Sequence, residues 1–207
     1  MSDISGEIKN LELFPSDSEG NKADAKKLAY VGSKPGVVAV RDSDSWFTPS
    51  RYTKMACEVM GGIELDPFSS KIANRSVQAQ RYFSIEDDAF RVDWQKEGRN
   101  ISSLWMNPPY GRGLINASVN AFIYYWDLGV IENAVVLVNN ATETTWFQKL
   151  ANRSCAICLP DKRIAFENFD GKSDKSGNTR GQIFLYFGPE VKCFRGVFSK
   201  IGVIMTP

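Results

Sequence analysis

Residues 102–111 read Ser-Ser-Leu-Trp-Met-Asn-Pro-Pro-Tyr-Gly, the most informative stretch of the chain. Its apolar run, residues 104–106, is typical of a short buried strand. Two prolines stop the strand, because a proline has no N–H to donate to a neighbouring strand. Asn107 precedes a proline, which pushes its backbone out of the helical region into an extended conformation. We therefore expect a buried strand that ends in a stiff turn.

The turn after this strand presents three groups that suit one kind of ligand. The Asn107 side-chain oxygen and the Pro108 carbonyl oxygen are both hydrogen-bond acceptors. If both accept from one amino group on an aromatic base, they hold the nitrogen and turn its lone pair toward an electrophile. The Tyr110 ring can stack on a base, which contributes roughly 1–3 kcal/mol. A base in a duplex has to leave its stack to reach such a pocket.

The sequence of residues 107–110 resembles the (Asp/Asn/Ser)-Pro-Pro-(Tyr/Phe) motif of the amino-methyltransferases. In that family the motif marks transfer of a methyl group from S-adenosylmethionine to the exocyclic amine of adenine or to a protein glutamine amide. The resemblance implies that Asn107, Pro108, Pro109 and Tyr110 form the catalytic turn. The other interpretation of these residues is a proline turn that only ends a strand.

Composition limits the classes of protein to which this chain can belong. Its 207 residues suit one domain with a sizeable core, and its 43% of hydrophobic residues indicates a globular chain. The net charge of +1 means that any DNA-binding surface has to be a local patch. The sequence contains no histidine, which excludes serine–histidine and cysteine–histidine catalysis and imidazole metal ligands.

Cysteine usage and the ends of the chain add further expectations. Cys155 and Cys158 form a CxxC in an apolar run without a second CxxC, so we favour buried thiols and expect no metal. No signal peptide or membrane span is visible, so we expect a cytoplasmic protein without a membrane partner. We expect residues 1–44 to be an N-terminal arm, either packed or mobile, and residues 45–207 to be a single domain.

A helix is predicted to begin after the sequence Trp-Phe-Thr-Pro at residues 46–49. Thr48 suits the N-cap position and Pro49 the first helical position, and Gly61-Gly62 ends the helix. The sequence also resembles the Trp-x-Thr-Pro start of phage-type DNA adenine methyltransferases. In that family it lies near the methionine end of the cofactor, which implies cofactor-binding roles for Trp46, Thr48 and Pro49. The other interpretation is that the aromatic residues only pack at the start of the helix.

Residues 63–70 are predicted to form a strand followed by a sharp turn, Asp66-Pro67-Phe68. These three residues resemble the Asp-Pro-Phe cofactor motif of the same enzymes. Asp66, at the end of a strand, could pair with the ammonium group of S-adenosylmethionine. Ser69-Ser70 stands where many relatives carry Gly-x-Gly, so the resemblance says less about the contacts of this turn.

Acidic residues follow a possible strand at residues 82–84. One of Glu86, Asp87 and Asp88 could bind the ribose hydroxyls or adenine amine of the cofactor, and we take Asp88 as the candidate. A solvated acidic loop is the other interpretation. Trp94 is either a core residue or a wall that stacks on the cofactor adenine.

The remaining hydrophobic pattern alternates between helices and strands. We predict helices near residues 73–77 and over 115–128, and a third that is capped by Thr142 or Thr144 and runs through Leu150. Strands are predicted at residues 134–138 and 156–159, and an antiparallel pair at 182–187 and 197–205. This order predicts an α/β fold, a mostly parallel, doubly wound, Rossmann-like sheet with an antiparallel terminal strand pair. Asp66 and Asn107 then both lie at carboxyl ends of strands, where such sheets bind ligands.

Basic residues near the predicted site are candidate DNA contacts. They are either solvated charges or phosphate contacts, and the polar, Gly-rich loop at residues 170–181 is either a solvated connection or an element that becomes ordered on DNA. The candidates are Arg112, Arg163, Lys172, Lys175 and Arg180.

Four motifs occur in the order of the phage-type DNA N-6-adenine-methyltransferases, ending with Arg-Ile-x-Phe at residues 163–166. The resemblance spans residues 46–187. It implies a site-specific enzyme that methylates the adenine amine in double-stranded DNA with S-adenosylmethionine. Two alternatives stay open: a protein glutamine methyltransferase, and a non-catalytic nucleic-acid-binding module on the same fold. The target sequence, the oligomeric state and the choice between phage DNA protection and restriction-modification also stay open.

Overall fold

The structure, a computed structural model, describes residues 47–110, 113–167 and 180–206. Five expectations concern residues outside these ranges, namely the arm at residues 1–44 and the side chains of Trp46, Arg112, Lys172 and Lys175. They stay predictions, as does the domain boundary at residue 45.

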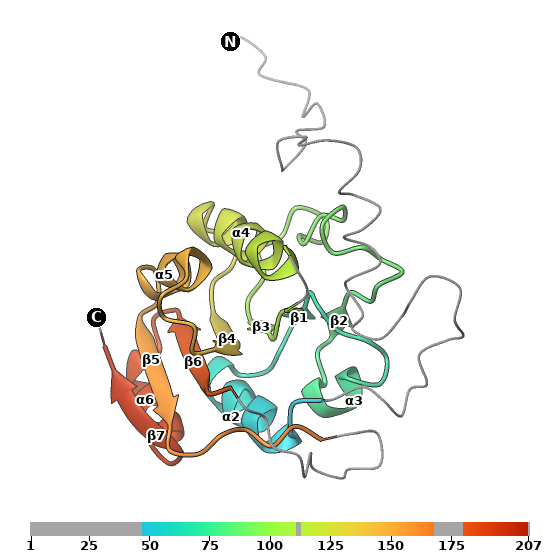
Figure 1. The fold of residues 1–207 in the computed structure, drawn as a ribbon. Helices are drawn as coiled ribbons and strands as arrows, with labels where there is room; N and C mark the ends of the chain where they lie inside the picture. Colours follow the sequence, from blue (N-terminus) through green and yellow to red (C-terminus); the bar gives the residue numbers. More distant parts are fainter. Residues whose placement is uncertain (1–46, 111–112, 168–179, 207) are drawn as a thin grey trace.

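The predicted strand before the proline turn is β3, the third strand of a seven-stranded sheet (Figure 1). The strand order is β2-β1-β3-β4-β6-β5-β7 within the described residues. The strands are β1 (Leu65–Asp66), β2 (Arg81–Tyr82), β3 (Leu104–Met106), β4 (Ala134–Asn139), β5 (Ala156–Pro160), β6 (Gln182–Phe187) and β7 (Gly202–Met205).

The strands on the β2 side of the sheet are parallel. β1 pairs in parallel with β2 and β3, and β3 pairs in parallel with β4. Leu65 lies opposite Leu104, and Leu104 lies opposite Ala134, so the carboxyl ends of β1, β3 and β4 reach the same edge. Every residue of β3 is buried, which explains its uninterrupted apolar sequence.

The other half of the sheet is antiparallel. β6 lies between β4 and β5 and is antiparallel to both, and β7 is antiparallel to β5. The sheet is therefore mixed, so the expected α/β class is confirmed. The expected doubly wound, mostly parallel arrangement stays a prediction at that level of detail.

The prediction of an antiparallel strand pair at 182–187 and 197–205 was wrong in two respects. β5 separates β6 from β7, so these two strands do not pair with each other. Val197 and Phe198 belong to a helix, α6 (Val191–Phe198). Val191, Phe194 and Val197 recur at helical spacing, and this period was missed because the short apolar run beside them also suits a strand.

Helices cover both faces of the sheet (Figure 1). One face is packed by α4 (Leu114–Asp127) and α5 (Thr145–Ala151), and Thr144 caps α5 with its side chain. The other face is packed by α2 (Ser50–Met60), the short α3 (Asn74–Val77) and α6. Successive β4 residues alternate between the two hydrophobic clusters, so this strand is the centre of the core.

The start of α2 differs from the prediction. Pro49 occupies the N-cap position, and no side chain makes a capping hydrogen bond there. Thr48 was expected to be the cap, and that prediction was wrong. Its hydroxyl oxygen instead accepts a hydrogen bond from Asn107 Nδ2 at 3.2 Å. The end of the helix was predicted correctly, because Gly61 adopts the left-handed conformation (φ 76°) that favours glycine.

Glycine at position 202 is required by the close approach of β7 to β5. A Cβ atom there would overlap the Leu159 carbonyl oxygen and lie 2.7 Å from Pro160 Cα. We expect Gly202→Ala to lower the free energy of unfolding by roughly 1–3 kcal/mol. Gly196, in α6, has open space around a Cβ, so Gly196→Ala is the matched control and should raise stability by roughly 0.5–1 kcal/mol. Urea unfolding measures both, and equal effects would contradict the packing argument.

Candidate active site

Two of the predicted site residues end neighbouring parallel strands. Asp66 is the last residue of β1, and Asn107 directly follows β3. Because β1 and β3 are paired in parallel with Leu65 opposite Leu104, both side chains lie at the same edge of the sheet. Open α/β sheets bind ligands at this carboxyl edge. The sequence placed both residues there correctly.

The Asn107 side chain is held by the segment before α2. Its Nδ2 atom donates to Thr48 Oγ1 at 3.2 Å, a contact that joins residues 59 positions apart. No hydrogen bond from the described residues reaches Asn107 Oδ1 or the Pro108 carbonyl oxygen. Both oxygens therefore keep their acceptor capacity for a ligand.

Thr48 is itself fixed from both sides. The preceding Phe47 forms a two-way bridge with Glu167, in which Phe47 N donates to Glu167 O (2.6 Å) and Glu167 N to Phe47 O (2.9 Å). The following Pro49 starts α2. Thr48 is 5% exposed. The Trp-x-Thr-Pro and Arg-Ile-x-Phe segments, far apart in the sequence, thus meet beside Asn107.

Tyr110 is anchored to the end of β4. The backbone N–H of Asn139 donates to the Tyr110 hydroxyl at 2.8 Å. Burial of that hydroxyl raises the pKa of Tyr110 well above its ordinary value, although the Asn139 N–H and the positive charge of Arg180 oppose the shift. The residue itself remains partly exposed. Its hydroxyl thus fixes the orientation of the ring beside the proline turn.

Gln182, at the start of β6, connects Asn139 to Ile164 and to Arg180. Its Nε2 atom donates to Asn139 Oδ1 (3.3 Å) and to the Arg180 carbonyl oxygen (2.8 Å). Its Oε1 atom accepts from Ile164 N at 3.2 Å. Gln182 is 6% exposed, so these three bonds satisfy a buried amide. They link both ends of the segment at residues 164–180 to β4.

Asp66 differs from Gln182, because its carboxyl group is buried and no cation among the described residues pairs with it. It is 3% exposed, and its Oδ1 atom accepts from Phe68 N at 3.2 Å. Burial raises the pKa of Asp66 to about 7, while the Phe68 N–H and the nearby Ser69 hydroxyl offset part of the rise. That hydroxyl does not reach full hydrogen-bond geometry, so Ser69 Oγ stays a buried polar atom without a partner among the described residues.

The aromatic residues beside Asp66 form a packed wall. Phe68 lies 5.5 Å from Phe90 and 5.9 Å from Trp94, measured between ring centroids. Trp94 is 0% exposed, stacks on Tyr125 at 4.9 Å and donates from Nε1 to the Ala89 carbonyl oxygen. Of the two interpretations of Trp94, the structure favours the core residue.

The three acidic candidates lie in the loop after β2. Glu86 is exposed, and Asp87 accepts from the N–H and the hydroxyl of Ser84, both at 2.7 Å. The Asp88 carboxylate is 3.3 Å from Arg91 Nε. Its backbone has φ 56°, a conformation that is uncommon outside glycine. The cofactor-binding role of Asp88 stays a prediction.

Two of the candidate DNA contacts lie among the described residues. Arg163 and Arg180 are both exposed. Arg163 precedes Ile164, whose N–H donates to Gln182, and the Arg180 carbonyl oxygen accepts from Gln182. The Arg180 charge is close enough to Tyr110 to lower its pKa. These arginines are therefore placed on the Tyr110 side of the carboxyl edge.

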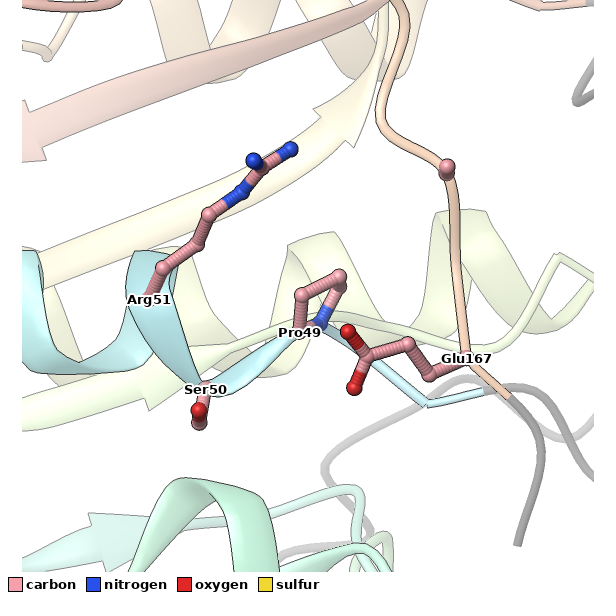
Figure 2. Close-up of a pocket in the computed structure, with 5 residues that line it drawn as sticks. Pro49, Ser50, Arg51 and Glu167 are labelled. Carbon is pink, nitrogen blue, oxygen red and sulfur yellow. The ribbon is translucent and has the colours of Figure 1, made fainter. Parts of the chain in front are cut away.

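A surface hollow of ≈ 170 Å³ lies next to this arrangement (Figure 2). Its lining comes from the start of α2 and the segment that pairs with Phe47, namely Pro49, Ser50, Arg51, Ala165 and Glu167. Figure 2 shows the Glu167 carboxyl group turned toward Pro49. Neither Asp66 nor Asn107 lines the hollow, so it is a neighbour of the candidate site and not the cavity expected between those residues.

Comparison with protein families identifies the family of the chain. A family model described as DNA N-6-adenine-methyltransferase (Dam) matches residues 37–202. The chain belongs to the Dam family. Comparisons with curated proteins and with solved structures gave no match. The matched range begins before the expected domain boundary and contains every candidate site residue of this Dam-family chain.

Sequence reasoning missed Asn139 and Gln182. Asn139 ends the buried strand β4, as Asp66 ends β1 and Asn107 follows β3, so its position at a strand end was an available signal. Gln182 offered a weaker one, a single polar residue at the start of the apolar strand β6. Its partners come from three segments, so only the folded structure identifies it.

The described part of this Dam-family chain lacks two kinds of feature. No group of three or more His, Cys, Asp or Glu side chains there could hold a metal ion. None of its helices combines the length and apolar character needed to cross a membrane. All four cysteines are free thiols, and Cys158 is buried in β5.

The buried carboxyl group of Asp66 predicts a pH-dependent effect on stability. Between the ordinary pKa of 3.8 and the folded value of about 7, the folded state binds a proton that the unfolded state has released. Stability therefore falls as pH rises through this range. We expect Asp66→Asn to raise the free energy of unfolding by roughly 1–4 kcal/mol at pH 8 and to have little effect at pH 4.

Urea unfolding at the two pH values measures this difference. The control is Asp127→Asn, which removes a surface carboxylate that is paired with Arg153 at 2.8 Å. We expect the control to change stability by at most about 1 kcal/mol. An Asp66→Asn effect of the same size at pH 4 and pH 8 would contradict the assigned burial cost.

Proposed function

We propose that this chain methylates the exocyclic amine of adenine at a defined sequence in double-stranded DNA, with S-adenosylmethionine as the methyl donor. The observation that carries the proposal is the position of Asn107 beside Asp66 at one edge of the sheet, with the amide held by Thr48. Membership of the Dam family supports adenine in DNA as the methyl acceptor. Sequence specificity is part of the proposal.

The residues around Asp66 fit the proposed cofactor. S-adenosylmethionine carries an ammonium group, and Asp66 is a buried carboxyl group without a cation among the described residues. An ammonium partner would favour the charged form of Asp66 and offset its desolvation. Ser69 Oγ, a buried polar atom without a partner in the same region, could accept a second hydrogen from it. When bound, the cofactor supplies an activated methyl group.

The residues of the proline turn would hold the target amine. An amino group on adenine is a weak nucleophile, because its lone pair is delocalised into the ring. Asn107 Oδ1 and the Pro108 carbonyl oxygen would each accept one of its hydrogens and localise the lone pair on nitrogen. Positioning of this kind supplies most of the rate in such a site. Water can take the proton that the nitrogen releases.

Tyr110 and the arginines would act on the DNA. The target base has to leave the helix, and its face would stack on the Tyr110 ring. The bond from Asn139 N–H to the Tyr110 hydroxyl holds that ring in place. Arg163 and Arg180, both exposed near this turn, could contact phosphates. With a net charge of +1, DNA binding would depend on this local patch.

The experiment that tests the function uses cofactor with a radiolabelled methyl group and unmethylated double-stranded DNA. After incubation, the DNA is digested to nucleosides and the protein is precipitated separately. We expect the label in N-6-methyl-2′-deoxyadenosine. Label in methylcytosine, or in the protein fraction, would overturn the proposal, and the second result would favour the glutamine methyltransferase.

A substitution at Asn107 tests the assigned role of the turn. Asn107→Ala removes one acceptor for the target amine, so we expect the transfer rate to fall by at least 100-fold, on the order of other losses of a preorganised group. Cofactor binding, measured by calorimetry, should survive. Asn152→Ala, at an exposed position at the end of α5, is the control and should keep full activity. An Asn107→Ala variant with native activity would exclude this role.

A further inference from the structure

The surface beside the candidate site carries positive charge on α2 and on the turn that leads into α3. We propose that Arg51, Lys54 and Lys71, which we call the α2–α3 basic face, contact the phosphate backbone of the DNA on one side of the target adenine. This inference rests on the proposed function and adds a second group of cations to Arg163 and Arg180. None of the three residues is among the DNA contacts that the sequence predicted.

The basic face follows directly after residues of the candidate site. Arg51 lies in the first turn of α2, just after Thr48, and Lys71 lies in the turn that follows Asp66. Thr48 bonds Asn107, and Asp66 ends a strand beside it, so both are at the carboxyl edge of the sheet. The chain therefore brings Arg51 and Lys71 to the edge where the target base would enter.

The three cations belong to one continuous surface. α2 and α3 lie side by side (Figure 1), and a hydrogen bond from Thr53 Oγ1 to the Ser76 carbonyl oxygen at 2.7 Å joins them. Arg51 and Lys54 are three positions apart in α2, so their side chains emerge on the same face of the helix. Both are exposed, as is Lys71.

The charges of this face have no ion-pair partner among the described residues. Arg51 Nη2 donates to the Tyr52 hydroxyl at 2.7 Å, and the guanidinium carbon lies 4.6 Å from the centroid of the Tyr52 ring. The phenol is neutral and leaves the charge uncompensated. Glu167 lines the same hollow as Arg51 without forming an ion pair with it. Within residues 47–77 the only exposed acidic side chain is that of Glu58.

The order of the strands places the proline turn between two groups of cations. β1, β3, β4 and β6 are successive neighbours in the sheet. Lys71 follows β1, the Tyr110 hydroxyl accepts from the end of β4, and Arg180 precedes β6. A nucleotide stacked on Tyr110 would therefore have the α2–α3 basic face on one side and Arg180 on the other. This arrangement fits a duplex, whose phosphates continue on both sides of the flipped base.

Phosphate is the ligand that the chemistry of this face favours. Arginine and lysine side chains only donate hydrogen bonds, and phosphate oxygens accept them. S-adenosylmethionine carries an ammonium and a sulfonium group, which these cations would repel, so its carboxylate is the one part of the cofactor that could compete. Phosphate contacts carry no sequence information. The face should therefore change the affinity for DNA and leave the choice of target unchanged.

The test replaces Arg51, Lys54 and Lys71 together by glutamine. Binding of a fluorescent double-stranded oligonucleotide is measured by anisotropy over a series of salt concentrations. Each phosphate contact contributes about 0.9 to the slope of log affinity against log salt, so we expect the slope to become shallower by about 2 to 3. We expect the affinity at about 0.1 M salt to fall at least roughly tenfold, equally for DNA of different sequences. The kcat at saturating DNA should stay within about twofold of native.

The matched control removes the same charge from the opposite end of the sheet. Lys96, Arg99 and Lys192 are likewise one arginine and two lysines, all exposed. Arg99 precedes the Ile101 bridge at the amino edge, and Lys192 lies in the first turn of α6, which follows β6. Their triple replacement by glutamine should keep DNA affinity within about threefold. Equal losses in the two triple variants would show that only total charge matters, and the inference would fail.

Single replacements keep the test decisive if the first triple variant does not fold. Lys54→Gln and Lys71→Gln should each make the salt slope shallower by about 0.9, and an unchanged slope in both would contradict the inference. A higher cofactor Kd in calorimetry with native DNA affinity would assign the face to the cofactor carboxylate instead. A changed methylation target would assign it to base recognition.

The binding measurement separates this inference from the proposed function. If the native protein binds DNA through this face and transfers no methyl group, the function is refuted and the face is retained. If the native protein methylates DNA and the triple variant at Arg51, Lys54 and Lys71 keeps the native salt slope, the basic face alone is refuted.

Discussion

The parallel pairing of β1 with β3, and of β3 with β4, is the constraint on which the site depends. Parallel neighbours send their carboxyl ends to the same edge, and the observed register brings Asp66 and Asn107 to that edge together. The same pairing sends Asn139, the end of β4, to this edge as well. A shift of one residue in β3 would turn its side chains to the opposite faces. The buried side chains of β3 on both faces of the sheet oppose such a shift.

Long-range hydrogen bonds then join segments that the strand pairing does not reach. Phe47 and Glu167 are 120 positions apart and form a two-way bridge beside α2. Thr48 and Asn107 are linked across 59 positions. Each of these bonds closes a long loop, and its entropy cost has to be offset by the packing of the folded chain. The site is therefore a product of the complete fold and not of one motif.

The sequence predicted the elements whose signals are local. The strand before the proline turn, the α2 end at Gly61 and the strand that ends at Asp66 each carry their own residue pattern. The positions of Asp66 and Asn107 followed from those strands and from one topological rule. Most of the helices and strands were found in this way, and so were the two residues that define the candidate site.

Sequence reasoning missed the features that depend on contacts between distant segments. The Thr48 hydroxyl suited a helix cap locally, but the position of Asn107 gives it a different partner. Gln182 gives only a weak signal in the sequence, because its three partners lie on separate segments. The helix α6 was mistaken for part of a strand, because a short apolar run fits either period. Only the packing of Phe194 and Phe198 against β6 decides that case.

Buried polar groups at the carboxyl edge are of two kinds: those with hydrogen-bond partners within the chain, and those without a full set of partners. The first kind stabilises the fold, and the second indicates a binding surface. Gln182 and the Tyr110 hydroxyl have partners within the chain, so burial makes these groups rigid. Among the described residues, no cation pairs with Asp66 and no partner of good geometry reaches Ser69 Oγ. A carboxyl group buried in this way costs stability, and folding alone gives no reason for it. The cost is explained if a cationic ligand replaces the lost hydration. The burial of Asp66, which lowers the stability of the fold, therefore indicates where on this edge a ligand binds.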